Sequence, residues 1–314
     1  MFHKGTKIYI TGGSGLVGRN IIENQHISNC TILAPKHNEL DLMDYNKVYD
    51  FIKKEKPDFI IHTAGQVGGI QANMNDPYGF FTNNTVMGVN VVRAAKELGI
   101  KNLLNLSSSC SYPCNISTPL SEEMILTGPF EKTNEGYAIA KTAILRMCEY
   151  ITEQFKGYHY KTLIPCNLYG RYDKFSPKNS HLIPAIIKKL HDAKINNISE
   201  IDIWGDGESR REFMYAGDFA QIVVDVLENF EKIPTVLNIG LGCDYTINEY
   251  YKTVAKVIGF EGNYVHDLSK PSGIKQKLLN IEKQKALGFK CKYSLEEGIK
   301  ETYNYFINEY KGEL

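Results

Sequence analysis

A tyrosine and a lysine one helical turn apart are the residues of this sequence with the most direct chemical use. In the stretch NEGYAIAK, Tyr137 and Lys141 are four residues apart, so a helix would place both side chains on one face. An ammonium group beside a phenol favours the phenolate and lowers the pKa of the phenol, which makes the tyrosine a better proton shuttle near neutral pH. Tyrosine and lysine at this spacing are also ordinary neighbours on a helix surface, so the pair needs further polar groups to indicate a site.

A serine and a cysteine follow an apolar run upstream of this pair. In the stretch NLLNLSSSCSYP, Ser108 stands at the carboxyl end of an expected strand, where open α/β sheets bind ligands. Its hydroxyl could hold a carbonyl oxygen against the tyrosine. Cys110 comes two residues later, and the rest of the chain has no cysteine pattern that would explain it.

A glycine-rich loop follows the first apolar run. The stretch TGGSGLVG carries Gly12, Gly15 and Gly18 in a G-x-x-G-x-x-G spacing, with Leu16 and Val17 opening a helix. Glycines here allow a tight turn and let the backbone approach a pyrophosphate at the start of that helix. The order of strand, loop and helix favours dinucleotide binding, and a glycine-rich turn without a ligand is the alternative.

The residues after the second expected strand bear on the choice of cofactor. An acid there would bind the ribose 2′-hydroxyl of NAD, but this chain has Lys36 and His37 and no acid until Glu39. We therefore favour NADP, while a solvated charge pair on a loop also explains these two residues. Asp41 and Leu42 fall where an adenine edge would lie, and a helix N-cap is the competing interpretation of Asp41.

The pattern of apolar runs predicts an α/β fold. Five short β-rich runs alternate with longer helical segments such as 80–98, which indicates a Rossmann-type, doubly wound parallel sheet. After about residue 170 the alternation loosens. We expect a dinucleotide-binding domain over 1–165 with a returning segment near 210–240, and a smaller, discontinuous α/β substrate lobe over 166–314.

Composition limits the partners and the compartment. The chain has 314 residues, with 36 basic and 36 acidic side chains, so its formal net charge is zero. A zero net charge argues against a nucleic-acid or membrane partner. The seven cysteines are scattered, without zinc-binding spacing, which predicts no metal and a reducing compartment. We see neither a signal sequence nor a membrane span and expect a cytoplasmic protein.

Taken together, the glycine loop, Ser108 and the Tyr137/Lys141 pair resemble an extended short-chain dehydrogenase/reductase over essentially the whole chain. The resemblance implies that the three side chains polarise a carbonyl or deprotonate an alcohol while a nicotinamide cofactor exchanges hydride. Sugar-nucleotide dehydratases of this kind carry an Asp-Glu pair after the active-site hydroxyl residue. This chain has Ser109 and Cys110 there, so the resemblance excludes that branch.

Several further stretches together resemble the GDP-L-fucose synthase family. They are VGGIQAN, SSSCSYP, TNEGYAIAK, CNLYGRYDKFSPKNSHLIPA and WGDGESRREF, in this order. Enzymes of this family epimerise GDP-4-keto-6-deoxy sugars at C3 and C5 and then reduce C4 with NADPH. The resemblance implies that Cys110 is the base and His181 the acid. A thiol titrates near enough to neutrality for the first role, although buried cysteines and structural histidines are common.

The same resemblance suggests where the GDP end of the substrate binds. Arg211 and Lys189 are candidates for the diphosphate, because an arginine fork suits bidentate contact and a lysine offers a point charge. The family typically has arginine at the position of Lys189 and a basic residue at that of Ser14. Lys188, Lys189 and Arg210 could instead be solvated helix and loop charges. Trp204, the only tryptophan, could pack on a sugar or base or fill the core.

The resemblance leaves the assembly and two other functions to consider. Segments 80–98 and 137–155 carry apolar stripes wider than one sheet face requires, and related enzymes pair such helices, so we expect a homodimer. One alternative function is a C4-reductase only, acting on a GDP-4-keto-6-deoxy-hexose or -heptose for surface polysaccharide. The other is a regulator that senses dinucleotides, which the retained Tyr137 and Lys141 disfavour.

Overall fold

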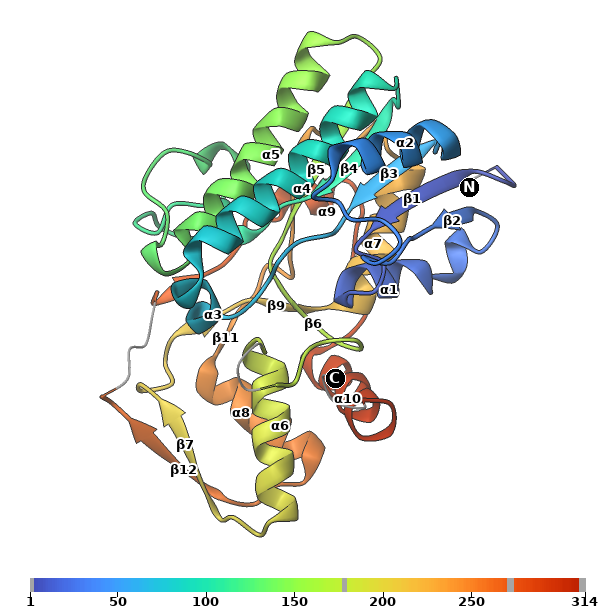
Figure 1. Ribbon diagram of the computed structural model, residues 1–314. Coiled ribbons are helices and arrows are strands. Elements are labelled where there is room, and N and C mark those ends of the chain that lie inside the picture. The colour runs from blue at the N-terminus through green and yellow to red at the C-terminus, as the bar shows by residue number, and fades with distance from the viewer. Residues whose placement is uncertain (1–2, 177–179, 270–273, 311–314) are drawn as a thin grey trace.

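A six-stranded parallel sheet forms the centre of the larger lobe in the computed structural model, which describes residues 3–176, 180–269 and 274–310 (Figure 1). All neighbouring strands in this sheet run parallel. In spatial order they are β10 (Val236–Ile239), β5 (His159–Pro165), β4 (Asn102–Leu106), β3 (Phe59–His62), β1 (Lys7–Thr11) and β2 (Thr31–Leu33).

Both faces of this sheet are covered by helices, because side chains alternate between the faces along each strand. In β1, Ile8 and Ile10 belong to one buried apolar cluster and Tyr9 to another on the opposite face. The arrangement confirms the predicted α/β fold with a doubly wound parallel sheet. The cluster around Tyr9 packs against α2 (Tyr45–Glu55), α4 (Pro77–Glu97) and α5 (Glu135–Gln154), and the other against α1 (Leu16–Ile22) and α7 (Ala216–Glu228).

The strand order places a topological switch between β1 and β3. From β1 the chain moves outward to β2 on one side, and then returns to β3, β4 and β5 on the other. Open α/β sheets bind ligands at the carboxyl ends of the strands on either side of such a switch. Here those ends are Thr11 and His62, which lie in register, with 2.9 Å between Thr11 Oγ1 and His62 Nδ1.

The long helix predicted over 80–98 begins earlier than expected. Asp76 caps it, because its side chain accepts a hydrogen bond of 2.9 Å from the Gly79 backbone N–H, and Pro77 occupies the first helical position. The helix packs along α5, and both cover the same face of the sheet, the one against which the cluster around Tyr9 lies (Figure 1). No helix within the described residues is long and apolar enough to span a bilayer.

The smaller lobe has its own apolar core. Its buried cluster includes Ile186, Tyr250, Val254 and Ile299, which come from three helices. Short strands flank these helices, among them the parallel pair β7 (Glu200–Trp204) and β12 (Asn263–Asp267) at the lower left of Figure 1. Its elements also include α6 (Leu182–Ile195), α8 (Ile247–Ile258), α10 (Leu295–Asn308), β8 (Arg210–Arg211), β11 (Tyr245–Thr246) and β13 (Gln276–Lys277).

The chain crosses between the lobes more than once. The parallel strands β6 (Asn167–Tyr169) and β9 (Phe213–Tyr215) lie side by side at the crossing (Figure 1). After β9 the chain re-enters the larger lobe, where α7 packs against α1 and β10 becomes an edge strand beside β5. The short helix α9 (Glu282–Ala286) then packs near β10.

A buried carboxylate lies at this crossing. Glu212 is 1% exposed, and burial raises its pKa to about 7. Its Oε1 accepts hydrogen bonds from the backbone N–H groups of Leu241 (2.6 Å) and Gly242 (2.8 Å), and its Oε2 accepts one from Leu279 (3.0 Å). One side chain therefore holds the segment that follows β10 and the segment that follows β13.

Replacing Glu212 should destabilise the fold strongly. Glu212→Ala leaves three buried N–H groups without an acceptor, and each such group costs about 1–3 kcal/mol. We expect a loss of roughly 3 kcal/mol or more in the free energy of unfolding, measured by urea denaturation, and a smaller loss for Glu212→Gln, which keeps one acceptor oxygen. Glu261→Ala, at an exposed position, is the control. Equal stability of the Glu212→Ala and Glu261→Ala variants would contradict the role of this carboxylate.

Candidate active site

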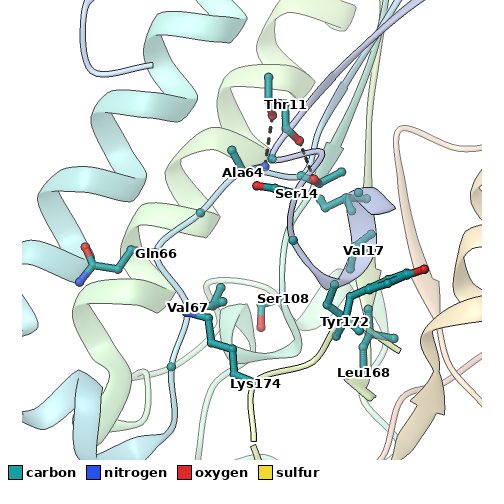
Figure 2. A pocket seen from close by; sticks show the side chains of 18 of the residues that line it. Thr11, Ser14, Val17, Ala64, Gln66, Val67, Ser108, Leu168, Tyr172 and Lys174 are labelled. Carbon is teal, nitrogen blue, oxygen red and sulfur yellow. Dashed lines mark hydrogen bonds between the residues drawn. The ribbon is translucent and has the colours of Figure 1, made fainter. Parts of the chain in front are cut away.

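A pocket of about 1000 Å³ opens at the carboxyl ends of β1, β3 and β4. The larger lobe contributes the glycine loop and the strand ends, and the smaller lobe contributes residues after β6 and the start of α6. Figure 2 shows side chains from both groups facing the same space. Its lining includes Gly12, Gly15, Leu16, Val17, Gly18, His37, Leu42, Ser108, Cys110, Tyr137, Lys141 and His181, which are most of the residues that the sequence indicated.

The glycine loop has the geometry that a dinucleotide requires. Gly12 has φ of +70°, and a Cβ there would lie 2.8 Å from the Cα of Ala64. A Cβ on Gly18 would lie 2.4 Å from the carbonyl oxygen of Gly12, whereas one on Gly15 would meet that oxygen at 3.4 Å. Side chains are therefore excluded where the turn must be tight, and the backbone is left free to approach a phosphate.

The segment after β3 forms the opposite wall of the pocket and is held by side-chain hydrogen bonds. The Thr63 hydroxyl donates to the carbonyl of Thr11 at 2.6 Å, and the Ala64 N–H donates to Thr11 Oγ1 at 3.2 Å (Figure 2). Further along, Asn84 of α4 accepts from the Gln66 N–H (3.0 Å) and donates to the Gln66 carbonyl (3.0 Å). These contacts fix an extended backbone directly across from the glycine loop.

Lys141 lies beneath the pocket as a buried cation. Its side chain is 6% exposed, and its ammonium donates a hydrogen bond of 2.9 Å to the carbonyl of Leu106 at the end of β4. Burial lowers the pKa of Lys141 to about 8. Its Nζ lies 5.9 Å from the centre of the Tyr137 ring, so the predicted pair does share one face of α5.

The expected effect of Lys141 on the Tyr137 pKa is wrong. Burial raises the pKa of Tyr137, the neighbouring Cys110 raises it further, and a hydrogen bond with Ser108 partly offsets both. Removing water from around a phenol disfavours its charged form, and this is the largest effect on the Tyr137 pKa. Tyr137 therefore keeps its proton at neutral pH, as a proton donor must.

Ser108 connects the tyrosine to the cysteine. It follows β4, and its Oγ accepts a hydrogen bond of 3.2 Å from the Cys110 N–H, which caps a short 3₁₀ helix over Ser109–Ser111. The same hydroxyl bonds with Tyr137. The cap places the Cys110 side chain close enough to Tyr137 to influence its pKa.

Two polar groups that sequence reasoning missed contact the thiol of Cys110. The Asn134 amide donates to Sγ at 3.1 Å, and the ammonium of Lys277, on β13 of the smaller lobe, lies 3.8 Å from Sγ. Asn134 falls within the stretch TNEGYAIAK, which could have singled it out. Nothing in the sequence around Lys277 distinguishes it from the other lysines.

His181 reaches the pocket from the start of α6, where it occupies the N-cap position. Burial lowers its pKa, and the positive charge of Lys174 lowers it further. Nearby, Asp173 also lines the pocket and is 7% exposed, and burial raises its pKa to about 7. Among the described residues its Oδ2 has no hydrogen-bond partner, and sequence reasoning missed this carboxyl too.

Two of the residues predicted to bind the cofactor do not line the pocket. Lys36 is exposed, and its backbone N–H donates to a Glu39 carboxylate oxygen at 2.7 Å. Asp41 accepts from the Met43 N–H at 2.9 Å, and the N-cap of α2 is Asp44, so the interpretation of Asp41 as a helix N-cap is wrong. Proteins often use such short Asp turns to shape loops.

The three predicted substrate residues belong to the smaller lobe and do not line the pocket. The Lys189 ammonium pairs with Asp202 at 2.7 Å, and the Arg211 guanidinium donates to the Ile274 carbonyl at 2.6 Å. Trp204 on β7 is 61% exposed, which excludes its alternative role in filling the core. Within the described ranges no three His, Cys, Asp or Glu side chains are grouped to hold a metal ion.

Comparison with known proteins agrees with this geometry. The model of the NAD dependent epimerase/dehydratase family matches residues 8–240. GDP-L-colitose synthase of Yersinia pseudotuberculosis is 49% identical over 96% of this chain and 98% of its own length. GDP-L-fucose synthase of Azorhizobium caulinodans is 49% identical over 97% of each chain.

A solved structure extends the likeness to the whole fold. MlghC, a GDP-mannoheptose C4 reductase from Campylobacter jejuni with NADP bound, superimposes with a TM-score of 0.89. It is 30% identical, and the superposition covers 98% of this chain and 100% of the other. These findings confirm the predicted resemblance. The chain belongs to the NAD dependent epimerase/dehydratase family and, within it, to the GDP-L-fucose synthase group.

Proposed function

We propose that this chain is an NADPH-dependent GDP-4-keto-6-deoxy-sugar 3,5-epimerase/4-reductase that serves activated deoxysugar synthesis. One observation carries the proposal: a single pocket, floored by the glycine loop, is lined by Ser108, Tyr137 and Lys141 and also by Cys110 and His181. Relatives named GDP-L-colitose synthase and GDP-L-fucose synthase, each 49% identical, support the same substrate class.

The glycine loop and the wall across from it fit a dinucleotide. Gly12 and Gly18 leave room for its phosphates, the half of the pocket lined by His37 and Leu42 would receive the adenosine end, and Lys141 lies at the opposite end near Tyr137. NADPH, when bound, supplies the hydride. The structural neighbour with NADP bound supports this choice. His37 lines the pocket where an acid would select NAD, and a basic residue there is compatible with the 2′-phosphate of NADPH.

For reduction at C4, Ser108 and Tyr137 act on the ketone oxygen. Tyr137 keeps its proton at neutral pH because burial raises its pKa, so its hydroxyl can donate that proton to the oxygen. The Ser108 hydroxyl, already bonded to Tyr137, holds the oxygen in place. As negative charge develops on the ketone oxygen, the buried Lys141 ammonium stabilises it, and the absence of water around the lysine strengthens this attraction.

For epimerisation, the ketone itself acidifies the hydrogens on C3 and C5. The Cys110 thiolate takes such a proton, so the C–H bond breaks, an S–H bond forms and the electron pair moves toward the C4 oxygen as an enolate. His181 in its protonated form returns a proton to the opposite face of the same carbon. Burial and the positive charge of Lys174 lower the pKa of His181, which makes its protonated form a stronger acid than a free imidazolium.

A reductase-only function is the second candidate. The neighbour with a TM-score of 0.89 is named a C4 reductase of a GDP-heptose, not an epimerase. On this alternative, Cys110 and His181 are retained without use, and another enzyme sets C3 and C5. The sugar would be a GDP-4-keto-6-deoxy-hexose or -heptose.

For the GDP end of the substrate we propose Arg211, Lys189 and Trp204. The Trp204 side chain is 61% exposed, and Lys189 lies on the same part of the lobe through its ion pair with Asp202 on β7. Arg211 now donates to backbone carbonyls, so a diphosphate would have to replace those acceptors. An arginine fork gains from that exchange because it binds phosphate bidentately.

We also propose a homodimer formed through α4 and α5. Apolar side chains remain exposed on these two helices, although the helices already pack on each other and on the sheet: Tyr78 (78%), Phe81 (40%), Ile139 (39%) and Tyr150 (55%). Pairing the two helices with their copies around a two-fold axis would cover this surface.

The first prediction separates epimerisation from reduction. Without NADPH, the protein should exchange the C3 and C5 hydrogens of GDP-4-keto-6-deoxy-mannose with deuterated water, followed by NMR. Cys110→Ser should abolish this exchange, since a hydroxyl is too weakly acidic to form the base, and should still reduce an already epimerised ketone. Tyr137→Phe is the matched control: it should keep the exchange and lose roughly 10²-fold in reduction, the usual contribution of a positioned acid.

The results divide the candidates clearly. Reduction without exchange by the unaltered protein would leave the reductase-only function. Exchange by Cys110→Ser as fast as by the unaltered protein would mean that another residue is the base.

The second prediction concerns pH. Lys141 must be charged to stabilise the developing oxyanion, and burial lowers its pKa to about 8. The ammonium is therefore present below pH 8 and is lost as the pH rises through this value. We expect kcat/KM for C4 reduction to fall above about pH 8, by about tenfold per pH unit at the limit. A profile that stays flat to pH 10 would contradict this, with fluorescence at each pH as the check on folding.

The third prediction concerns assembly. Light scattering should give a mass of twice 35.6 kDa, and Tyr150→Asp should convert the protein to the monomer by burying a charge in the interface. Ile195→Asp, at an exposed apolar position of the smaller lobe, should leave the dimer intact. A monomer mass for the unaltered protein at every concentration would refute the proposed interface.

A further inference from the structure

The contact between Cys110 and Lys277 joins residues that are 167 positions apart and lie on different lobes. The Lys277 Nζ is 3.8 Å from Sγ, and the Asn134 amide donates to the same sulfur at 3.1 Å. Both partners present N–H groups to the sulfur, and one of them is a full cation. Such a pair of donors suits a sulfur that carries negative charge better than a neutral thiol.

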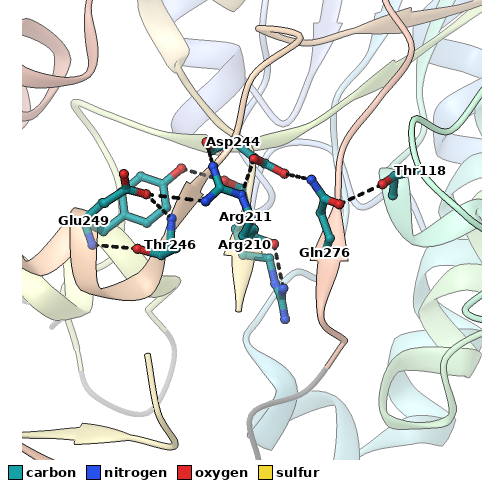
Figure 3. Close-up of polar contacts among 8 residues, drawn as sticks. Thr118, Arg210, Arg211, Asp244, Thr246, Glu249 and Gln276 are labelled. Carbon is teal, nitrogen blue, oxygen red and sulfur yellow. Dashed lines mark hydrogen bonds and ion pairs between the residues drawn. The ribbon is translucent and has the colours of Figure 1, made fainter. Parts of the chain in front are cut away.

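The strand that carries Lys277 is held firmly in place. Its neighbour Gln276 donates to Asp244 Oδ2 at 2.6 Å and accepts from the Thr118 hydroxyl at 3.1 Å (Figure 3). Two residues after Lys277, the Leu279 N–H donates to the buried Glu212 carboxylate. The lysine is therefore positioned on both sides by contacts that do not involve its own side chain.

The charge of Lys277 is available to the sulfur. Lys189 is neutralised by Asp202 at 2.7 Å, whereas in the part of the chain that the structure describes no carboxylate forms an ion pair with Lys277. Tyr137 of α5, which holds its proton, also lies close enough to interact with Cys110. From the remaining sides, Ser108 and Asn134 contribute only neutral groups.

We propose that Lys277 is a positioning residue for Cys110, whose ammonium stabilises the thiolate that removes protons from the sugar. The inference rests on the proposed function, because only an epimerase uses that thiolate. In the step itself the carbon-bound proton passes to sulfur and the electron pair enters the enolate, while Lys277 keeps its own proton. The lysine thus acts through the cysteine and not on the substrate.

The test follows the thiolate directly, without any sugar. The thiolate, not the thiol, reacts with iodoacetamide, and this reagent is neutral, so the lysine cannot act by attracting it. Alkylation of the Cys110 peptide at pH 7 is timed by mass spectrometry. In Lys277→Met the rate should fall about fivefold or more, the effect of a unit charge 4 Å away in water. Lys277→Arg should restore most of it.

Two controls isolate the charge. The exposed Cys243 should be alkylated at the same rate in every variant, which shows that the fold and the reagent are unchanged. Lys275→Met removes a neighbouring exposed lysine and should leave the Cys110 rate unaltered. An unchanged Cys110 rate in Lys277→Met overturns the inference, and so does an equal loss in Lys277→Met and Lys277→Arg, which would indicate packing.

Catalytic measurements then separate this inference from the proposed function. Deuterium exchange at C3 and C5 should fall in Lys277→Met by about the same factor as alkylation. If the unaltered protein exchanges no deuterium, the epimerase function fails, whatever the alkylation rates are. If Lys277→Met instead raises KM for the GDP-sugar and leaves the alkylation rate alone, the lysine serves the substrate's phosphates and the inference is overturned.

Discussion

The buried carboxylate of Glu212 is the interaction on which the two-lobed arrangement depends. A charged group that is 1% exposed is stable only if its oxygens are paired, and three backbone N–H groups pair them. Those groups belong to the segments after β10 and β13. The central sheet and the strand that carries Lys277 are thus held to one side chain. Asn238 of β10 reinforces this contact between the lobes by donating to the carbonyls of Leu120 and Asn280.

The contacts of Glu212 and Asn238 between the lobes explain how groups with different chemistry come together around one pocket. The larger lobe supplies Ser108, Tyr137 and Lys141 from elements that are fixed by the parallel sheet. The smaller lobe supplies His181 to the pocket and places Lys277 against the sulfur of Cys110, and the position of both depends on contacts between the lobes. In the proposed mechanism, reduction uses only the first set, whereas epimerisation uses both. A small shift of one lobe against the other would therefore impair epimerisation before it impaired reduction.

Features that depend on short-range residue patterns could be predicted from the sequence. Features that depend on contacts between distant parts of the chain could not. The strands, the glycine loop and the Tyr137/Lys141 pair follow from periodicity and short spacing, and the structure places them as expected. Lys277 could not be found, because its contact with Cys110 spans 167 residues and arises from the packing of two lobes. The Tyr137 pKa was predicted in the wrong direction, because four-residue spacing shows the ammonium but not the burial.

Burial shifts the pKa values of Tyr137 and Lys141, the pair proposed for reduction, in opposite directions, and near pH 7 neither shift removes the protonated form that the proposed reduction requires. Loss of water penalises any charged form, so it raises the pKa of Tyr137 and lowers that of Lys141 to about 8. Near pH 7 the tyrosine is consequently a neutral donor, while the lysine is still a cation. Charge that develops on the ketone oxygen then meets a proton and an ammonium in a poorly screened environment. A chain with no net charge achieves this locally, through where its few buried charges lie.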